Sequence, residues 1–247
     1  MITDIESSSS SQNKKRKAEI SPKNTLYLNQ RIKDNKKELT NIERIYENER
    51  VELNLATHNI NGLKTNSQKF EALYEWMIDN ELDIVGLAET NISAKEGFFL
   101  GKSLEEYKNF WSSTSPDKKK GSGVGLLISK KWEKHLGQIE RTNEYMISAS
   151  FFFKQVEIII IVVYLPPNDK EERKVIQKSI IDKYIKRLPK TQIVVMGNFN
   201  ATVNKSLDRS SSQKKKQVKS DPLLSWLSRQ EFSDAFRVIN PDTKEFS

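Results

Sequence analysis

The sequence predicts an α/β fold in which helices pack on mixed β-sheets. From residue 51 onward, short apolar runs alternate with longer amphipathic segments, which is the pattern of β–α–β units. One pair of apolar runs, residues 146–153 and 156–164, is separated only by Lys154 and Gln155. This spacing indicates a β-hairpin, so antiparallel pairs are expected beside the parallel ones.

The expected elements follow in order from residue 53. Strands are expected at residues 53–56, 83–88, 122–129, 146–153, 156–164 and 192–196. The first helix is expected at residues 68–80, because apolar side chains recur at i, i+3, i+4 and i+7: Phe70, Leu73, Tyr74 and Met77. A second helix is expected at residues 170–187, where Pro189 ends it, and a third at 223–228 after Asp221-Pro222.

Residues 1–50 differ in composition from residues 51–247, which we expect to form the folded domain. The first segment holds five consecutive serines at 7–11, followed by Lys14-Lys15-Arg16-Lys17. Because it has few apolar side chains to bury, we expect a basic, largely disordered extension. The cluster at 14–17 suits nuclear import or contact with nucleic acid, and a solvated charge run is the alternative. The expected location is nuclear, otherwise cytoplasmic.

Composition narrows the function. The chain of 247 residues has 41 Lys and Arg against 33 Asp and Glu, a net charge of +8. It has no cysteine, which excludes disulfide scaffolds, thiolate zinc sites and cysteine nucleophiles. The longest apolar run, residues 158–165, is far shorter than the roughly 20 residues that span a bilayer, so no membrane partner is expected.

Polar residues follow four of the apolar runs. His58, Asn59 and Asn61 come after the first, Glu89 after the second, Tyr164 ends the third, and Asn198 and Asn200 follow the fourth. Strand ends on one side of a sheet bring distant residues together. One carboxylate with several amides suits Mg²⁺, which keeps much of its hydration, and suits zinc badly. Each piece also has a plain structural interpretation as a turn, a strand exit or a helix cap.

The whole set resembles one known family. The residues that carry the resemblance are Asn59-Ile60-Asn61-Gly62-Leu63, Leu87-Ala88-Glu89-Thr90, Gly123-Val124-Gly125, Val163-Tyr164-Leu165-Pro166-Pro167-Asn168 and Gly197-Asn198-Phe199-Asn200-Ala201. They resemble the endonuclease/exonuclease/phosphatase (DNase I-like) superfamily, above all the endonuclease domain of non-LTR (LINE or jockey-type) retrotransposon proteins. The resemblance covers residues 51–247 and implies a four-layer α/β/β/α sandwich.

The resemblance also implies a role for each matching residue. Glu89 corresponds to the carboxylate that holds Mg²⁺ (or Mn²⁺), and Asn59 to the amide beside it. Tyr164 corresponds to the phenol that contacts the scissile phosphate. Asn200 matches a residue of the Gly-Asp-Phe-Asn motif that contacts the phosphate and leaving group. The implied reaction is hydrolysis of a phosphodiester by water.

Two departures from the family pattern bear on activity. The motif's aspartate is Asn198 here, and an amide cannot accept a proton near neutral pH. A missing general base typically costs about 10²–10⁴ in rate. The family continues through two further strands and a Ser-Asp-His segment, so we expect the domain to be truncated at its C-terminus. Neither His58 nor His135 is placed in the sequence to replace that histidine.

Two lysine-rich stretches indicate a polyanionic partner, DNA or RNA. The alternative is that both stretches are solvated loops without a partner. The candidate nucleic-acid contacts are Lys118, Lys119, Lys120, Lys205, Arg209, Lys214, Lys215 and Lys216. We therefore expect an Mg²⁺-dependent endonuclease domain of a retroelement protein that is catalytically impaired. The alternatives are a nucleic-acid-binding module without activity and a retroelement remnant without function. The sequence does not indicate an oligomeric state.

Overall fold

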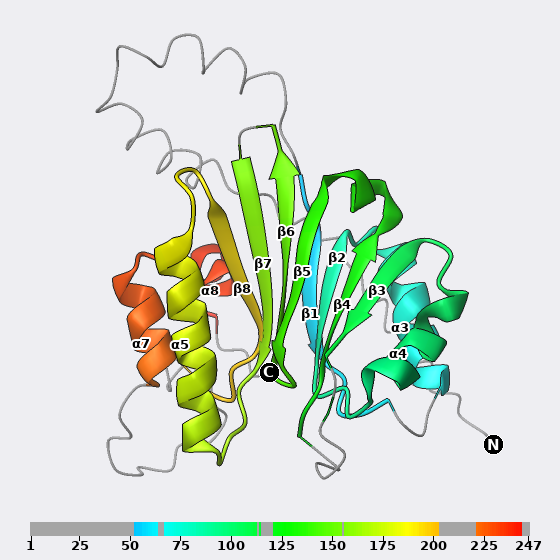
Figure 1. Cartoon of the computed structure of the whole chain (residues 1–247), viewed down its shortest axis with the longest axis horizontal. Helices are drawn as coiled ribbons and strands as arrows, with labels where there is room; N and C mark the ends of the chain where they lie inside the picture. The colour runs from blue at the N-terminus through cyan, green and yellow to red at the C-terminus, as the bar shows by residue number, and fades with distance from the viewer. Residues whose placement is uncertain are drawn as a thin grey trace, which may run out of the picture.

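Two four-stranded β-sheets pack face to face in the computed structural model, and helices cover the outer face of each sheet (Figure 1). The structure describes residues 52–63, 67–112, 114, 121–154, 156–202 and 221–243. The helices and strands, in chain order, are β1 (Leu55–Asn59), α3 (Ser67–Asp79), β2 (Ile84–Ala88), α4 (Ala94–Leu100), β3 (Tyr107–Trp111), β4 (Val124–Ser129), β5 (Leu136–Asn143), β6 (Met146–Phe153), β7 (Val156–Tyr164), α5 (Lys170–Lys186), β8 (Gln192–Asn198), α7 (Pro222–Arg229) and α8 (Ala235–Ile239).

Both sheets are mixed. Their strand orders are β1-β2-β4-β3 and β5-β6-β7-β8. The pairs β1–β2 and β7–β8 are parallel, and the helices α3 and α5 make the crossovers between them. All other pairs are antiparallel, including the β6–β7 hairpin. The expected α/β/β/α sandwich is confirmed, with α3 and α4 on one outer face and α5 and α7 on the other (Figure 1).

Two apolar clusters hold the layers together. The larger one lies between the sheets and beneath α5 and α7, and it buries Phe151, Ile176 and Leu223 almost completely. The second lies between the first sheet and its helices, where α3 contributes the predicted apolar face of Phe70, Leu73 and Met77. α4 packs closely on this side, because a Cβ on Gly97 would lie 2.4 Å from the ring of Trp111.

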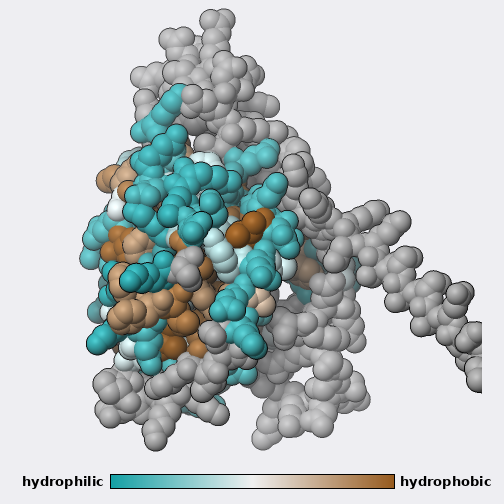
Figure 2. Space-filling model, turned by 90° about the vertical axis from the view of Figure 1, so that its right-hand side faces the viewer, coloured by the Kyte–Doolittle hydropathy of each residue, from teal (hydrophilic) through white to brown (hydrophobic). Residues whose placement is uncertain are grey.

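Not all apolar side chains on this side are covered. Figure 2 shows a brown area within the hydrophilic surface of the face that carries α3 and α4. Exposed large apolar residues on these two helices are Trp76, Ile78, Phe98 and Phe99. No described helix is long and apolar enough to cross a membrane.

The structure corrects the bounds of several predicted strands and adds two strands and two α-helices that were not predicted, one of which is α8. β1 begins two residues later than expected and ends at Asn59, so this residue belongs to the strand. The pattern missed β3 and β5, which are edge strands with polar residues on one face, and the short helix α4, which has a capping box formed by Ser93 and Glu96. The predicted extension at residues 1–50 lies outside the described residues.

Candidate active site

The ends of four strands meet at one edge of the sandwich. Asn59 is the last residue of β1, and Glu89 directly follows β2. Tyr164 and Asn198 end β7 and β8 and lie opposite each other in the ladder. Because β1 runs parallel to β2 and β7 to β8, each pair delivers its carboxyl-terminal residues to the same edge. The structure thus brings the ends of these four strands to one edge.

A chain of backbone hydrogen bonds joins the loops at this edge across both sheets. We call residues 59–62, 89–91, 121–123, 144–145, 164–166 and 197–200 the rim. The bonds run from Gly62 N to Glu89 O (2.7 Å), Thr90 N to Gly123 O (3.0 Å), Gly123 N to Glu144 O (3.0 Å), Tyr164 N to Tyr145 O (2.9 Å) and Leu165 N to Asn198 O (2.8 Å). The two sheets therefore share one continuous loop network at the candidate site.

Unusual backbone conformations gather in the rim. Eight of the twelve described residues with positive φ belong to it: Asn61, Gly62, Glu89, Asn91, Gly121, Gly123, Gly197 and Asn200. Gly197 illustrates the cause, because a Cβ there would lie 1.9 Å from the carbonyl oxygen of Val163 on the neighbouring strand. Non-glycine residues hold positive φ only where their surroundings fix them, and such strain clusters at functional sites.

Asn59 and Glu89 form a direct pair in the rim. The Asn59 Nδ2 donates to Glu89 Oε2 at 3.2 Å. The Asn59 Oδ1 accepts from the backbone N of Asn61 at 3.0 Å, which fixes the orientation of the amide. This arrangement aims one oxygen of the carboxylate at the amide and leaves the other available to a ligand.

Tyr164 is a buried residue of the rim. Its ring stacks on Tyr145 with centroids 6.2 Å apart, and a Cβ on Gly121 would lie 3.4 Å from its hydroxyl. Burial is the main cause that raises the pKa of Tyr164, and the negative charge of Glu89 raises it further. A hydrogen bond with the Asn200 side chain opposes this shift in part. The phenol is therefore a neutral donor at physiological pH.

Asn198 and Asn200 form a tight turn after β8. The Asn198 Oδ1 accepts from the backbone N of Asn200 at 2.9 Å. The Asn200 Nδ2 donates to the carbonyl of Leu165 at 2.9 Å, so the turn is tied to the loop after Tyr164. All five predicted catalytic residues, Asn59, Glu89, Tyr164, Asn198 and Asn200, thus lie on the rim.

The predicted nucleic-acid contacts all lie outside the described residues: Lys118, Lys119, Lys120, Lys205, Arg209, Lys214, Lys215 and Lys216. The described residues next to these stretches do lie at the site. Gly121, which follows the first stretch, is beside the Tyr164 hydroxyl. The second stretch is flanked by the 198–200 turn and by Asp221, which are both bound to Arg173.

Two basic side chains that the sequence analysis missed hold the rim loops. Lys69, in the first turn of α3, donates to the carbonyls of Ile60 and Gly62. Arg173, in the first turn of α5, donates to the carbonyls of Leu165 and Pro166 in the loop after β7, and to the carbonyl of Phe199 in the turn after β8. No local sequence signal marks either residue, because each contact depends on how the start of the helix packs against loop carbonyls.

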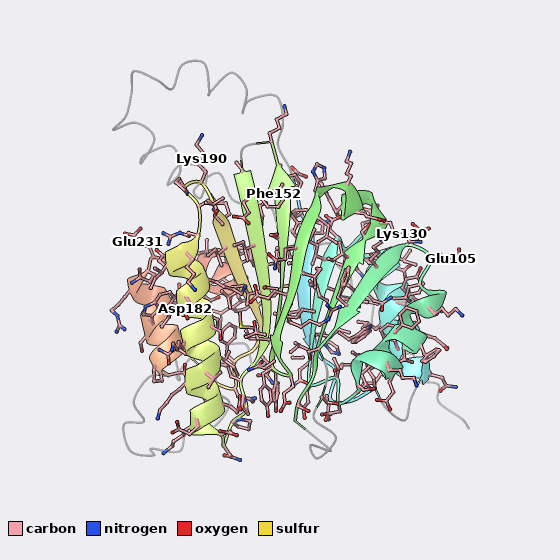
Figure 3. All side chains as sticks on the ribbon, in the orientation of Figure 1. Glu105, Lys130, Phe152, Asp182, Lys190 and Glu231 are labelled. Carbon is pink, nitrogen blue, oxygen red and sulfur yellow. The ribbon has the colours of Figure 1, made fainter. Side chains whose placement is uncertain are left out.

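Neither histidine brings an imidazole to the cluster of five residues. His135 stacks on Phe153 with ring centroids 4.4 Å apart, and its Nδ1 lies 3.0 Å from the carbonyl oxygen of Phe152. Phe152 lies at the end of the second sheet opposite the rim (Figure 3). His58 precedes Asn59 on β1, so its side chain points to the other face of the strand.

Comparison with known proteins identifies the family. The model of the Endonuclease/Exonuclease/phosphatase family matches residues 56–229, a range that contains every rim residue named above. The chain belongs to the endonuclease/exonuclease/phosphatase family. Comparison with curated proteins gives no match.

Solved structures with the same fold include other members of nuclease and phosphatase groups. An AP endonuclease from Archaeoglobus fulgidus is 16% identical, with a TM-score of 0.59 over 78% of this chain and 76% of that one. A variant of the 3′ phosphatase NExo from Neisseria, bound to a product DNA hairpin, is 15% identical, with a TM-score of 0.56 over 76% and 75%. The endonuclease domain of TRAS1, a telomere-specific non-LTR retrotransposon, is 14% identical, with a TM-score of 0.50 over 70% of each chain.

Two further solved structures match over a smaller fraction of their own length. The chain spans 61% to 63% of the length of two TDP2 structures from D. rerio. The similarity to the AP endonuclease and to the NExo variant shows the same fold.

Proposed function

We propose that this chain is an Mg²⁺-dependent phosphodiesterase that nicks DNA, the endonuclease domain of a retroelement protein, with turnover reduced by Asn198. The observation that carries the proposal is the convergence of Asn59, Glu89, Tyr164, Asn198 and Asn200 on one rim. These five residues come from four strand ends in two sheets.

The donor set of the rim fits a hydrated magnesium ion. Glu89 supplies the carboxylate that would hold the ion, and the Asn59 amide at 3.2 Å orients it. Across the described residues, no three His, Cys, Asp or Glu side chains gather as a metal cage. One carboxylate with waters suits Mg²⁺ or Mn²⁺ and not zinc. When bound, the ion would stabilise negative charge on the phosphate oxygens and orient the substrate.

The Tyr164 phenol is the proposed donor to the phosphate, and Asn200 holds it in place. The neutral Tyr164 phenol can donate to a non-bridging phosphate oxygen, and the raised pKa keeps it protonated in the working pH range. Asn200 is exposed, and its side chain already bonds the Leu165 carbonyl, which fixes it beside the phenol. Donors that are held in place before the substrate arrives lose little free energy to reorganisation during the reaction.

Asn198 does not supply the general base that this arrangement needs for fast catalysis. Its oxygen is held by the backbone N of Asn200 at 2.9 Å, so it supports the turn as a carboxylate would. It cannot take a proton from water at neutral pH, because an amide is not a base in that range. The expected consequence is a rate lower by about 10²–10⁴ than with a general base.

DNA is the proposed partner for two reasons. The lysine-rich stretches are continuous in sequence with residues of the candidate site. The first is followed by Gly121, which lies beside Tyr164, and the second lies in the chain between the 198–200 turn and Asp221. A structure with the same fold is bound to a DNA product. The retroelement origin is supported by the Asn59-Ile60-Asn61-Gly62 opening and by the similarity to the TRAS1 endonuclease domain.

The test is nicking of supercoiled plasmid with and without Mg²⁺. Nicking should require the ion, disappear with a chelator and be lost in Glu89→Ala. Glu105→Ala is the matched control, because it removes an exposed carboxylate on the loop before β3, away from the rim (Figure 3). Unchanged nicking in Glu89→Ala would refute the assignment of Glu89. Absence of Mg²⁺-dependent nicking in the wild-type protein would refute the catalytic proposal.

A second candidate is a DNA-binding module without activity, and Asn198 is the observation that favours it. The rim would then hold a phosphate backbone without hydrolysing it. Binding should weaken steeply as salt rises, because phosphate contacts release counterions. A titration at low salt that shows no affinity for DNA would exclude this function.

A further inference from the structure

Arg173 makes an unusual set of contacts beneath the rim. Its Nη1 donates to the carbonyls of Leu165 and Pro166 at 3.3 and 3.2 Å. Its Nη2 donates to the carbonyl of Phe199 at 3.3 Å and to the carboxylate of Asp221. The guanidinium therefore binds three segments that are far apart in the sequence.

The number of donors decides what this side chain can do. A guanidinium has five N–H groups, and the four on Nη1 and Nη2 match the four acceptors that Arg173 contacts. The charge is also matched, because Asp221 pairs with it and the two side chains are only 17% and 10% exposed. Arg173 thus has little capacity left to bind a phosphate directly.

We propose that Arg173 is the positioning residue of the candidate site, which sets the loop after Tyr164 against the 198–200 turn. This inference rests on the proposed function. The carbonyls that it binds are one and two residues after Tyr164, and between Asn198 and Asn200. Arg173 therefore acts through three of the five predicted catalytic residues without touching the substrate.

A lysine could not reproduce this arrangement. The planar fork of arginine reaches acceptors on two sides at once, whereas an ammonium is a point charge on a flexible stem. Asp221 adds a further constraint, because its other oxygen caps α7 by accepting from Leu223 N at 2.9 Å. The loops, α5 and α7 are consequently locked through one side chain.

The test compares three variants. Arg173→Lys keeps a positive charge near Asp221 but loses the fork. The double variant Arg173→Met with Asp221→Asn removes the guanidinium without leaving a buried charge unpaired, and asparagine still caps α7. Lys183→Met is the matched control, since it removes another ion pair of α5, to Glu140, away from the rim. Plasmid nicking with Mg²⁺ gives kcat and KM, and hydrogen exchange reports on peptides covering residues 164–168 and 198–202.

Both Arg173 variants should lose about 10²-fold in kcat, the cost of misplacing catalytic groups by about 1 Å, while KM stays close to wild type. Both peptides should exchange faster than in the wild type, and Lys183→Met should change neither readout. Wild-type kcat in Arg173→Lys, unchanged exchange, or the same changes in Lys183→Met would overturn the inference. If the wild-type protein does not nick DNA, the proposed function fails, and hydrogen exchange alone decides whether Arg173 positions the loops.

Discussion

Replacing Asn198 with aspartate should raise the nicking rate of this chain. The substitution is nearly isosteric, and a carboxylate oxygen would still accept from the backbone N of Asn200, now 2.9 Å from the Asn198 Oδ1. That bond becomes charge-assisted and somewhat stronger. The turn should therefore stay as it is, and the change would act on the chemistry alone.

The size of the effect follows from what a carboxylate adds. With an ordinary pKa of about 3.9, an aspartate is ionised at neutral pH and can accept a proton from water. A positioned general base contributes about 10²–10⁴ in rate, which equals about 2.7–5.5 kcal/mol in activation free energy. On the acid side, the ratio of kcat/KM in the variant to that in the wild type should rise with pH as the added carboxylate ionises.

The assay is the initial rate of plasmid nicking in Mg²⁺ at subsaturating substrate. Asn200→Asp is the matched control, because it adds the same charge two residues away but loses the donor to the Leu165 carbonyl. Only Asn198→Asp should gain activity. If its rate equals that of the wild type while Glu89→Ala abolishes nicking, position 198 does not supply the base and the account of the impairment is wrong.

Three further predictions test the fold, the rim and the partner. Burial first and Asp83 second raise the pKa of Tyr107 to about 12, so between pH 10 and 12 the folded chain keeps a proton that the unfolded chain loses. The contribution of the Tyr107 phenol to the free energy of unfolding is fully present below pH 10 and should be lost as pH rises toward 12. Tyr107→Phe should therefore flatten the dependence of this free energy on pH, measured by urea unfolding. Gly123→Ala places a Cβ 2.3 Å from the Thr90 Oγ1 at a φ of +85°, and it should lower the free energy of unfolding by about 1–3 kcal/mol and reduce nicking. Unchanged stability would show that the rim can relax there. Replacing the lysines at residues 118–120 with glutamine should reduce the slope of log K against log salt by about 2.7, if each neutralises one phosphate of double-stranded DNA. An unchanged slope would exclude them as phosphate contacts.

The sequence predicts best those elements whose burial is uniform. The hairpin of β6 and β7 has the predicted bounds, because both strands are apolar and only two residues separate them. β5 was missed because Gln138, Glu140 and Arg141 interrupt its apolar residues on an edge of the sheet. α4 was missed because it is short and exposes Phe98 and Phe99 while it buries only a glycine.

Some residues of the candidate site could be predicted from the sequence, and others could not. Asn59, Glu89 and Tyr164 could be predicted, because each follows or ends an apolar run and strand direction alone brings them together. Arg173 could not be predicted, because its role depends on carbonyl groups whose positions are set by the packing of α5 and α7. The positive φ of Glu89 was likewise invisible in a residue type that rarely adopts it.

Under the proposed function, binding of a phosphate and turnover depend on different residues of the rim. Asn198 keeps the one contact that shapes its turn, and the hydrogen bonds of Asn59, Tyr164 and Asn200 do not depend on a charge at position 198. A neutral side chain there also removes one negative charge that would repel the DNA backbone near Glu89. Affinity for uncleaved DNA should therefore be at least as high in the wild-type protein as in Asn198→Asp, although the variant turns over faster. The opposite order of affinities would mean that residue 198 contributes to substrate binding through more than its turn.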